Sequence, residues 1–204
     1  MINQCIAVVM AAGESKRFGE RKLYRRLGDK PVIYHVLDAL KAVDLKDVLV
    51  VVQPGDTLDT TFTLLENPNY SSGQSSSIRR AMAHDSTWEG AFFCPADQPF
   101  VNPEIMRAMA DVLQEGVIVV PRFQGRNGSP VLFSHTFREE LSQLQGEEGG
   151  RPIIRRHPES LVFFELPSEE MFLDIDTVED LIEARARVTK SSRRDPSDCD
   201  KVKP

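Results

Sequence analysis

The sequence predicts a three-layer α/β fold in which a mostly parallel β-sheet is covered by helices. Two observations carry this prediction. Short apolar runs rich in β-branched residues alternate along the chain with segments whose apolar residues have helical spacing. The first run, at 7–10, leads into a glycine-containing loop, and a later run ends at Asp97. Open α/β sheets bind their ligands at such strand ends, so the same observations indicate where a functional site lies.

The expected elements follow one another in a regular order. Apolar runs predict strands at 7–10, 47–52, 90–97, 116–120 and 129–133, with late strand candidates at 161–166 and 171–175. Helical spacing predicts helices at 31–40, from about 75–77 to 83, and at 103–113, 135–144 and 178–188. Pro31 suits the first turn of its helix. Residues 62–65 are ambiguous between the two classes.

Composition limits the class of protein. The 204 residues suffice for one domain, expected at 1–188, and the expected flexible tail at 189–204 is rich in Ser, Asp, Lys, Arg and Pro. A net charge of −6 argues against a nucleic-acid-coating role. Cys5, Cys94 and Cys199 are far apart and odd in number, which argues for a reducing compartment and against a zinc site. No apolar stretch fits a signal peptide or a membrane span, so we expect a cytoplasmic protein.

The loop after the first strand has the features of a polyphosphate site. Its first residues have almost no side chain, so a ligand can approach the main chain and its amide hydrogens can hold phosphate oxygens. Arg17 and Lys22 add positive charge. The alternative is a basic surface turn behind a core strand. The candidate nucleotide-binding residues of this loop are Ala11, Ala12, Gly13, Ser15 and Lys22.

This loop matches neither of the two commoner phosphate motifs. A P-loop ends in Gly-Lys-Ser/Thr, whereas Gly19 is followed here by Glu20 and Arg21. A dinucleotide fingerprint needs three closely spaced glycines, and the loop has only Gly13 and Gly19.

Three aspartates are the candidate ligands of a divalent metal. Asp97 follows an apolar run and is expected at the carboxyl edge of the sheet, where a hard carboxylate suits Mg²⁺. In an extended segment, Asp174 and Asp176 would share one face and could complete the site. Thr177 and Asp180 also form a capping box, which gives Asp176 the alternative of a role at a helix start. Which of the two late aspartates binds the metal stays open, with Asp174 slightly ahead.

A further candidate site joins an Asn-Pro turn to a helix start. A glycine followed by hydroxyl side chains supplies amide donors and short acceptors for a ribose or a base edge. The alternative is that Ser77 is an ordinary helix N-cap. The candidate residues are Asn67, Gly73, Ser76 and Ser77.

Taken in order, these motifs resemble those of the molybdenum cofactor cytidylyltransferases, a branch of the nucleotidyltransferases with a Rossmann-like fold. The first loop has the form Ala-Ala-Gly-x-Ser-x-Arg-Phe-Gly-x-x-Lys-Leu, and the turn at Asp97 has the form Ala-Asp-x-Pro. The late segment has the form Asp-Ile-Asp-Thr-x-Glu-Asp-Leu. The related guanylyltransferases typically have glycine where Ala12 stands. The resemblance extends from Ile6 to about Arg187.

The resemblance implies a Rossmann-like nucleotidyltransferase domain that moves CMP from CTP to the terminal phosphate of a molybdopterin-type cofactor and releases pyrophosphate. It implies Mg²⁺ as cofactor and Arg17, Lys22 and Asp97 as catalytic residues. On the acceptor side it implies Gly128 and Pro130, at a strand entry, and Arg151, after a glycine-containing loop. Two features depart from the family pattern. Gln98 stands where Met is common, and the loop at 146–151 keeps the spacing but not every residue.

Two alternatives stay open. One is a related transferase that uses GTP or a sugar-phosphate acceptor. The other is a non-enzymatic carrier that hands the finished cofactor to a molybdenum hydroxylase, which is also a candidate partner of the enzyme. The combination of Arg17, Lys22, Asp97 and Asp174 favours catalysis, because a carrier needs no site for a metal and a triphosphate.

Overall fold

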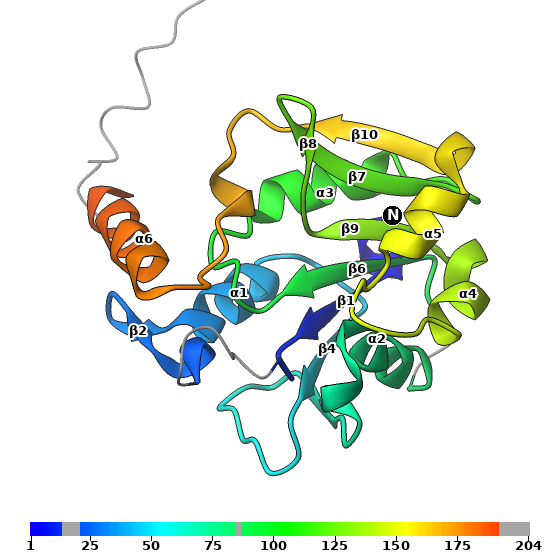
Figure 1. Cartoon of the computed structure of the whole chain (residues 1–204). Coiled ribbons are helices and arrows are strands. Elements are labelled where there is room, and N and C mark those ends of the chain that lie inside the picture. Colours follow the sequence, from blue (N-terminus) through cyan, green and yellow to red (C-terminus); the bar gives the residue numbers. More distant parts are fainter. Residues whose placement is uncertain (14–20, 85–86, 192–204) are drawn as a thin grey trace, which may run out of the picture.

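The central feature of the computed structural model, which describes residues 1–13, 21–84 and 87–191, is a twisted mixed sheet (Figure 1). Its strand order is β10-β7-β9-β6-β1-β4-β5, and the short β8 pairs with β7. All neighbouring pairs are parallel except those of β9 and β8. The predicted mostly parallel sheet is therefore confirmed. Its strands are β1 (Cys5–Met10), β4 (Asp47–Val52), β5 (Thr63–Glu66), β6 (Gly90–Pro95), β7 (Ile118–Phe123), β8 (Arg126–Asn127), β9 (Val131–Ser134) and β10 (Leu161–Glu165).

Helices cover both faces of this sheet. Two pack on one face, α1 (Val32–Lys41) and α3 (Pro103–Asp111). Three pack on the other, α2 (Gln74–Met82), α4 (Arg138–Ser142) and α5 (Arg151–Arg156). A small hairpin of β2 (Arg26–Leu27) and β3 (Lys30–Pro31) lies beside the sheet with α6 (Val178–Ser191). Short 3₁₀ helices are η1 (Ile2–Gln4), η2 (Lys22–Tyr24), η3 (Tyr70–Ser72), η4 (His135–Phe137), η5 (Pro158–Ser160) and η6 (Glu170–Phe172).

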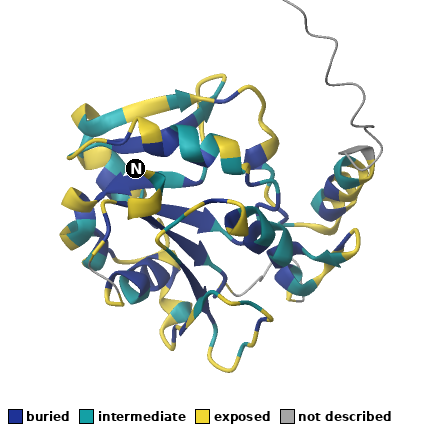
Figure 2. Ribbon diagram, turned by 180° about the vertical axis from the view of Figure 1, so that it is seen from behind, coloured by how far each residue is buried: buried dark blue, intermediate teal, exposed yellow. Residues whose placement is uncertain are grey.

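The two-fold period of the strands divides the core into two layers. In β1, Ala7 and Val9 pack into the cluster that includes α1 and α3. Ile6 and Val8 of the same strand pack with α2 on the opposite face. Figure 2 shows the central strands as the most deeply buried part of the molecule. A strand buried on both faces must be apolar at every position, which is why its sequence shows a continuous run and no alternation.

Several predicted boundaries differ from the observed ones. The ambiguous segment at 62–65 overlaps strand β5, which covers Thr63–Glu66, and the expected helix at 135–144 is divided into η4 and α4. The predicted strand at 171–175 is wrong, because η6 covers its start and the chain from 173 to 176 pairs with no strand among the described residues. The side chain of Phe172 packs with Leu166 and Met171 in a separate apolar cluster. This packing directs the segment away from the edge of the sheet.

The described end of the chain is helical. Helix α6 ends at Ser191 and not at the expected residue 188. Residues 192–204 lie outside the described part, so the division into a domain and a tail stays a prediction. No helix among the described residues is long and apolar enough to cross a membrane.

The sheet topology places two strand ends side by side at a topological switch point. From β1, the chain continues to β4 and β5 on one side, and it later returns to β6 on the other. Met10 of β1 is in register with Pro95 of β6, so the loops that follow these strands leave the same edge together. Ligands of open α/β sheets bind at such points.

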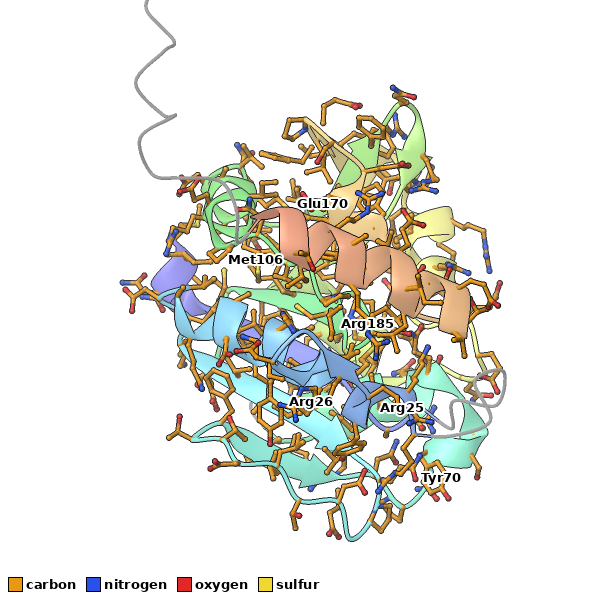
Figure 3. The ribbon with its side chains drawn as sticks, turned by 90° about the vertical axis from the view of Figure 1, so that its left-hand side faces the viewer. Arg25, Arg26, Tyr70, Met106, Glu170 and Arg185 are labelled. Atoms are coloured by element: carbon orange, nitrogen blue, oxygen red, sulfur yellow. The ribbon has the colours of Figure 1, made fainter. Side chains whose placement is uncertain are left out.

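Helix α6 connects this edge to the small hairpin. Leu181 and Ala184 pack with Leu27, Val32 and Ile175 in a separate apolar cluster. The Arg185 guanidinium donates two hydrogen bonds to the main-chain carbonyl of Arg26, at 2.9 and 3.2 Å. Figure 3, which labels both arginines, shows α6 lying alongside the hairpin. The helix therefore fixes the segment that precedes it, which contains Asp176.

A reciprocal capping box begins α6, as the sequence predicts. The amides of Asp176 and Thr177 donate to Asp180 Oδ2 at 3.0 and 2.8 Å. The Asp180 amide donates to Thr177 Oγ1 at 3.2 Å. These bonds satisfy amides that have no partner within the helix.

The capping box should contribute measurably to stability. Thr177→Ala and Asp180→Ala should each lower the free energy of unfolding by about 1 kcal/mol, because each removes a cap from α6. Urea unfolding followed by circular dichroism measures the loss. Glu179→Ala, in the same first turn, serves as the control because its side chain takes no part in these capping bonds. Equal midpoints for the cap variants and the control would contradict the role of the box.

A close approach at Gly128 gives a second prediction. A Cβ atom there would lie 2.1 Å from Phe172 Cε1, whereas a Cβ at Gly13 would meet no heavy atom of the described residues within 4 Å. Gly128→Ala should therefore lower the free energy of unfolding by about 1–3 kcal/mol through overpacking. Gly13→Ala should leave it nearly unchanged. A stability loss of the same size in both variants would contradict this assignment of the Gly128 position.

Candidate functional site

Three charged side chains from distant segments meet at the switch point. Lys22 lies in η2, Asp97 follows β6, and Asp176 precedes α6. The Lys22 ammonium donates to Asp97 Oδ2 and to Asp176 Oδ1, both at 2.6 Å. The Ile175 amide donates to the Asp97 carbonyl at 3.0 Å, so the main chain also joins the two acidic segments. The structure therefore brings together three of the residues that the sequence singled out.

The environment of Lys22 keeps it charged. Burial lowers the pKa of Lys22, but the negative charge of Asp97 and the hydrogen bonds that Lys22 donates to Asp176 and Asp97 outweigh that effect. The pKa of Lys22 therefore lies above its usual value, and the ammonium is protonated at neutral pH. Only 13% of its side chain is exposed. The two carboxylates thus flank a position that is already occupied by a positive charge, the Lys22 ammonium.

Asp174 has a different partner from Asp176. Gln98 Nε2 donates to Asp174 Oδ1 at 2.8 Å. Asp174 lines a cavity and is exposed, but neighbouring protein atoms displace part of the water around its carboxylate. This partial loss of water, together with the charges of Asp97 and Asp176, raises the pKa of Asp174, and the bond from Gln98 opposes the rise.

The candidate metal ligands Asp97, Asp174 and Asp176 are therefore not equivalent. Within the described residues, no three His, Cys, Asp or Glu side chains are arranged to hold one metal ion. Asp97 and Asp176 do share one cation, the Lys22 ammonium. A pair of hard carboxylates fits Mg²⁺, which commonly takes one or two carboxylates together with phosphate oxygens and water.

The glycine-containing loop is held by a residue that the sequence analysis missed. The Ala11 amide donates to the Val51 carbonyl at 2.9 Å. Gln53 Nε2 donates to the carbonyls of Ala12 and Gly13, at 3.2 Å each. Because both carbonyl groups accept from Gln53, the orientation of their peptide units in the turn is fixed. Gln53 directly follows the predicted strand at 47–52, so its position at the same sheet edge was a usable signal.

A small cavity of about 90 Å³ adjoins this loop, lined by Ala11, Gly13, Arg21, Leu23, Tyr24, Gln53 and Asp56. An ion pair joins Arg21 to Asp56 at its wall. The candidates Ser15 and Arg17 lie outside the described residues.

The polar side chains of the Asn-Pro turn are engaged with one another. Asn67 Nδ2 donates to Ser76 Oγ at 2.8 Å and to Ser77 Oγ at 3.2 Å. Ser76 Oγ donates to the Gly73 carbonyl at 2.8 Å. All three side chains are buried. The hydrogen bonds of these three buried side chains therefore hold the turn in its conformation.

Gly73 is the N-cap residue of α2, so the alternative role of Ser77 as N-cap is wrong. The backbone there has φ = +91°, a conformation that favours glycine. A Cβ atom would also lie 2.6 Å from the Gly146 carbonyl oxygen. Gly73 thus lets the start of α2 approach the loop at 146–151.

A larger cavity of about 550 Å³ opens on the other side of Asp97. Gly128 and Arg151, two of the predicted acceptor residues, line it. Pro130, the third, is itself buried. Polar and charged lining residues include Gln74, Asp97, Gln98, Arg126, Asn127, Arg151, Arg155 and Asp174. Its apolar lining includes Met10, Ile78, Phe93, Val120, Phe133 and Phe172.

Two of these lining residues were not among the predicted site residues, although each begins a segment that contains some. Arg126 lies in the short strand β8, just before Gly128, and its guanidinium carbon is 5.6 Å from the centre of the Phe172 ring. Phe172 precedes the segment that contains Asp174 and Asp176. Arg155 also lines the cavity, but its guanidinium is paired with Glu148 at 2.7 Å. Arg156 and His157 pair with Glu140, at 2.6 and 2.9 Å.

Relatives with related activities share most of the length of this chain. It is 25% identical over 194 residues to the molybdenum cofactor cytidylyltransferase of Escherichia coli K12, with 90% of this chain and 96% of that protein covered. It is 27% identical over 188 residues to the probable molybdenum cofactor guanylyltransferase of Thermococcus gammatolerans, covering 86% and 96%. A crystal structure of Rv0371c from Mycobacterium tuberculosis H37Rv in complex with manganese superposes with a TM-score of 0.72 at 26% identity, covering 90% and 98%.

The family model of the MobA-like NTP transferase domain matches residues 7–161. That range contains the glycine-containing loop, the turn at Asp97 and the cavity wall at Gly128. Both the predicted Rossmann-like fold and the family resemblance are confirmed. The chain therefore belongs to the MobA-like NTP transferase domain family, whose members are nucleotidyltransferases.

Proposed function

We propose that this protein transfers CMP from CTP to the terminal phosphate of a molybdopterin-type cofactor and releases pyrophosphate. The observation that carries the proposal is the meeting of Lys22, Asp97 and Asp176 between a glycine-containing loop and a cavity lined by arginines. The names of the relatives supply the acceptor, since both the Escherichia coli and the Thermococcus proteins are named as molybdenum cofactor transferases.

The donor side of the site is built for a triphosphate. The main chain of residues 11–13, whose carbonyls Gln53 holds in part, would approach the phosphates, and Lys22 would neutralise charge on the α-phosphate and on the departing pyrophosphate. We assign Arg17 the same role on the pyrophosphate. Gly73 and the turn that Asn67, Ser76 and Ser77 support would lie against the nucleoside.

Asp97 and Asp176 would hold the Mg²⁺. The ion, when bound, supplies positive charge that stabilises the transition state of phosphoryl transfer. Two facts support this role: the pair already shares one cation, and a relative of 26% identity has been crystallised with manganese. A bound triphosphate would give Lys22 an alternative anionic partner, so that Asp97 and Asp176 would be available to hold the metal.

The acceptor side needs orientation more than proton transfer. A phosphate nucleophile is already ionised at neutral pH, so the site requires no general base. Arg151 would bind an anionic group of the acceptor, since guanidinium groups bind phosphate with two hydrogen bonds. Gly128 and the apolar lining would shape the space for its ring system.

The choice of CTP over GTP rests on Ala12. This residue is only 2% exposed and lies at the turn after β1, where the related guanylyltransferases typically carry a glycine. The methyl group packs in the core cluster that includes α2, and we propose that this packing sets the position of the turn so that less space remains beside it for a purine. Relatives of both nucleotide classes match the chain at similar identity, so the base preference depends on this local argument.

Direct turnover tests the proposal. The purified protein is incubated with Mg²⁺, the molybdopterin cofactor and either CTP or GTP, and pyrophosphate release is measured. We expect release with CTP that depends on the acceptor. Release only from GTP would overturn the cytidylyl assignment. Tight cofactor binding without pyrophosphate release from any nucleotide would instead indicate a carrier that serves a molybdenum hydroxylase.

Asp97→Asn tests the metal site. The substitution keeps the shape of the side chain but removes the charge, so turnover should fall by about 10²–10³-fold, as is typical for the loss of one electrostatic contact to a transition state. The thermal unfolding midpoint should change little. Asp111→Asn, at the end of α3, is the control. Full activity of Asp97→Asn, or of the wild-type protein in EDTA, would exclude this mechanism.

Ala12→Gly tests the origin of base selection. Removing the methyl group should raise kcat/KM for GTP relative to CTP, and competition between the two nucleotides in one reaction measures the ratio directly. An unchanged ratio would show that Ala12 does not select the base.

A further inference from the structure

The two late aspartates face different halves of the site, although only one residue separates them. Asp176 accepts a hydrogen bond from Lys22, which also bonds to Asp97. Asp174 accepts from Gln98 and lines the 550 Å³ cavity, which neither Lys22 nor Asp176 lines. In an extended segment, Asp174 and Asp176 would lie on one face, opposite the buried Ile175, so the segment alone does not explain their different surroundings. The hydrogen bond from Gln98 accounts for the position of Asp174 in the cavity wall.

Gln98 is an unusual side chain for this place. It is only 6% exposed, and its Oε1 atom is buried with no hydrogen-bond partner among the described residues. Leaving a buried amide oxygen without a partner is costly. The opposite orientation of the amide would direct Oε1 at the Asp174 carboxylate, where two acceptors would repel. The hydrogen bond to Asp174 therefore holds the amide in its orientation, and in that orientation Oε1 has no hydrogen bond among the described residues.

We propose that Gln98 is a positioning residue for the acceptor half of the site: its amide holds Asp174 in the cavity wall, where the carboxylate binds hydrogen-bond donors of the acceptor molecule. This inference rests on the proposed nucleotidyl transfer and assigns Asp174 to the acceptor, while Asp97 and Asp176 hold the metal. Arg151 and Asp174 line the same cavity with opposite charges. The acceptor that fits them carries both an anionic group and N–H donors.

Four variants separate this proposal from a purely structural role. Gln98→Met has a side chain of similar length without hydrogen-bonding groups, and Asp174→Asn keeps shape while losing charge. Asp176→Asn and the double variant Gln98→Met/Asp174→Asn complete the set. The matched control is Gln143→Met, because Gln143 is an exposed glutamine that also donates to a carboxylate, that of Glu139.

Two measurements are made on each variant: the KM values for the molybdopterin cofactor and for CTP, and the binding of Mn²⁺ in the presence of CTP, followed by electron paramagnetic resonance. Gln98→Met and Asp174→Asn should each raise the KM for the cofactor by about 10-fold, as expected for one hydrogen bond to a charged group. The KM for CTP and the Mn²⁺ affinity should stay within about twofold of the wild-type values. Asp176→Asn should weaken Mn²⁺ binding by about 10-fold or more.

The double variant tests whether Gln98 acts through Asp174. If it does, the double variant should have the same KM for the cofactor as Asp174→Asn alone, because the second change removes nothing further. Multiplied effects of the two changes would show that Gln98 acts independently and would overturn the proposal.

Equal effects of Asp174→Asn and Asp176→Asn on Mn²⁺ binding would also overturn it. The Mn²⁺ titration needs no turnover, so it judges the division of the two aspartates even if the wild-type protein transfers no nucleotide and the proposed function fails. Should Gln98→Met not fold, Gln98→Glu replaces it with an isosteric side chain. This variant places a second carboxylate against Asp174 and should raise the KM for the cofactor at least as much.

Discussion

The Lys22 ammonium between Asp97 and Asp176 is the interaction on which the site depends. Two carboxylates from segments far apart in the chain repel each other when a fold brings them close. The ammonium, at 2.6 Å from an oxygen of each, removes that repulsion. The chain thus contains its own charge compensation at the point where the proposed reaction would need a metal and a triphosphate.

The rest of the fold serves to bring these three residues together. The parallel register of β1 and β6 places the loop that leads to Lys22 beside the turn that carries Asp97. Helix α6, capped at its start and packed on the β2–β3 hairpin, fixes Asp176 relative to η2. The hairpin follows η2, which begins with Lys22, so one apolar cluster supports the segments on both sides of the ion pair. Stability of the hairpin and geometry of the site are therefore coupled.

The site has two halves that differ in chemistry. On the side proposed for the donor, the loop around Gly13 has little side-chain volume and the Lys22 ammonium supplies positive charge. On the side proposed for the acceptor, a larger cavity combines arginines with aromatic walls, and Phe172 reaches that wall because Gly128 leaves room for its ring. Asp97 and Gln98 are adjacent in the chain. Asp97 shares the Lys22 ammonium with Asp176, whereas Gln98 donates to Asp174. Adjacent residues of one turn thus connect the two halves.

The sequence by itself determined the layers, the mostly parallel sheet and the main catalytic candidates, because these follow from local properties. A strand buried on both faces must be apolar throughout, and the residue that follows it must lie at the sheet edge, so Asp97 and the loop at 11–13 could be found without a structure. The capping box of α6 was equally local.

Only the tertiary structure decided which partner each aspartate has. Asp174 and Asp176 look alike in sequence, and the difference arises from Gln98 and Lys22, which approach from distant segments. Phe172, expected in a strand, instead fills an apolar cluster, and Asn67 and its two serines bond to one another within the core. Long-range packing and hydrogen bonding override local pattern at these positions, since the free energy of burying each group depends on neighbours that the local sequence does not contain.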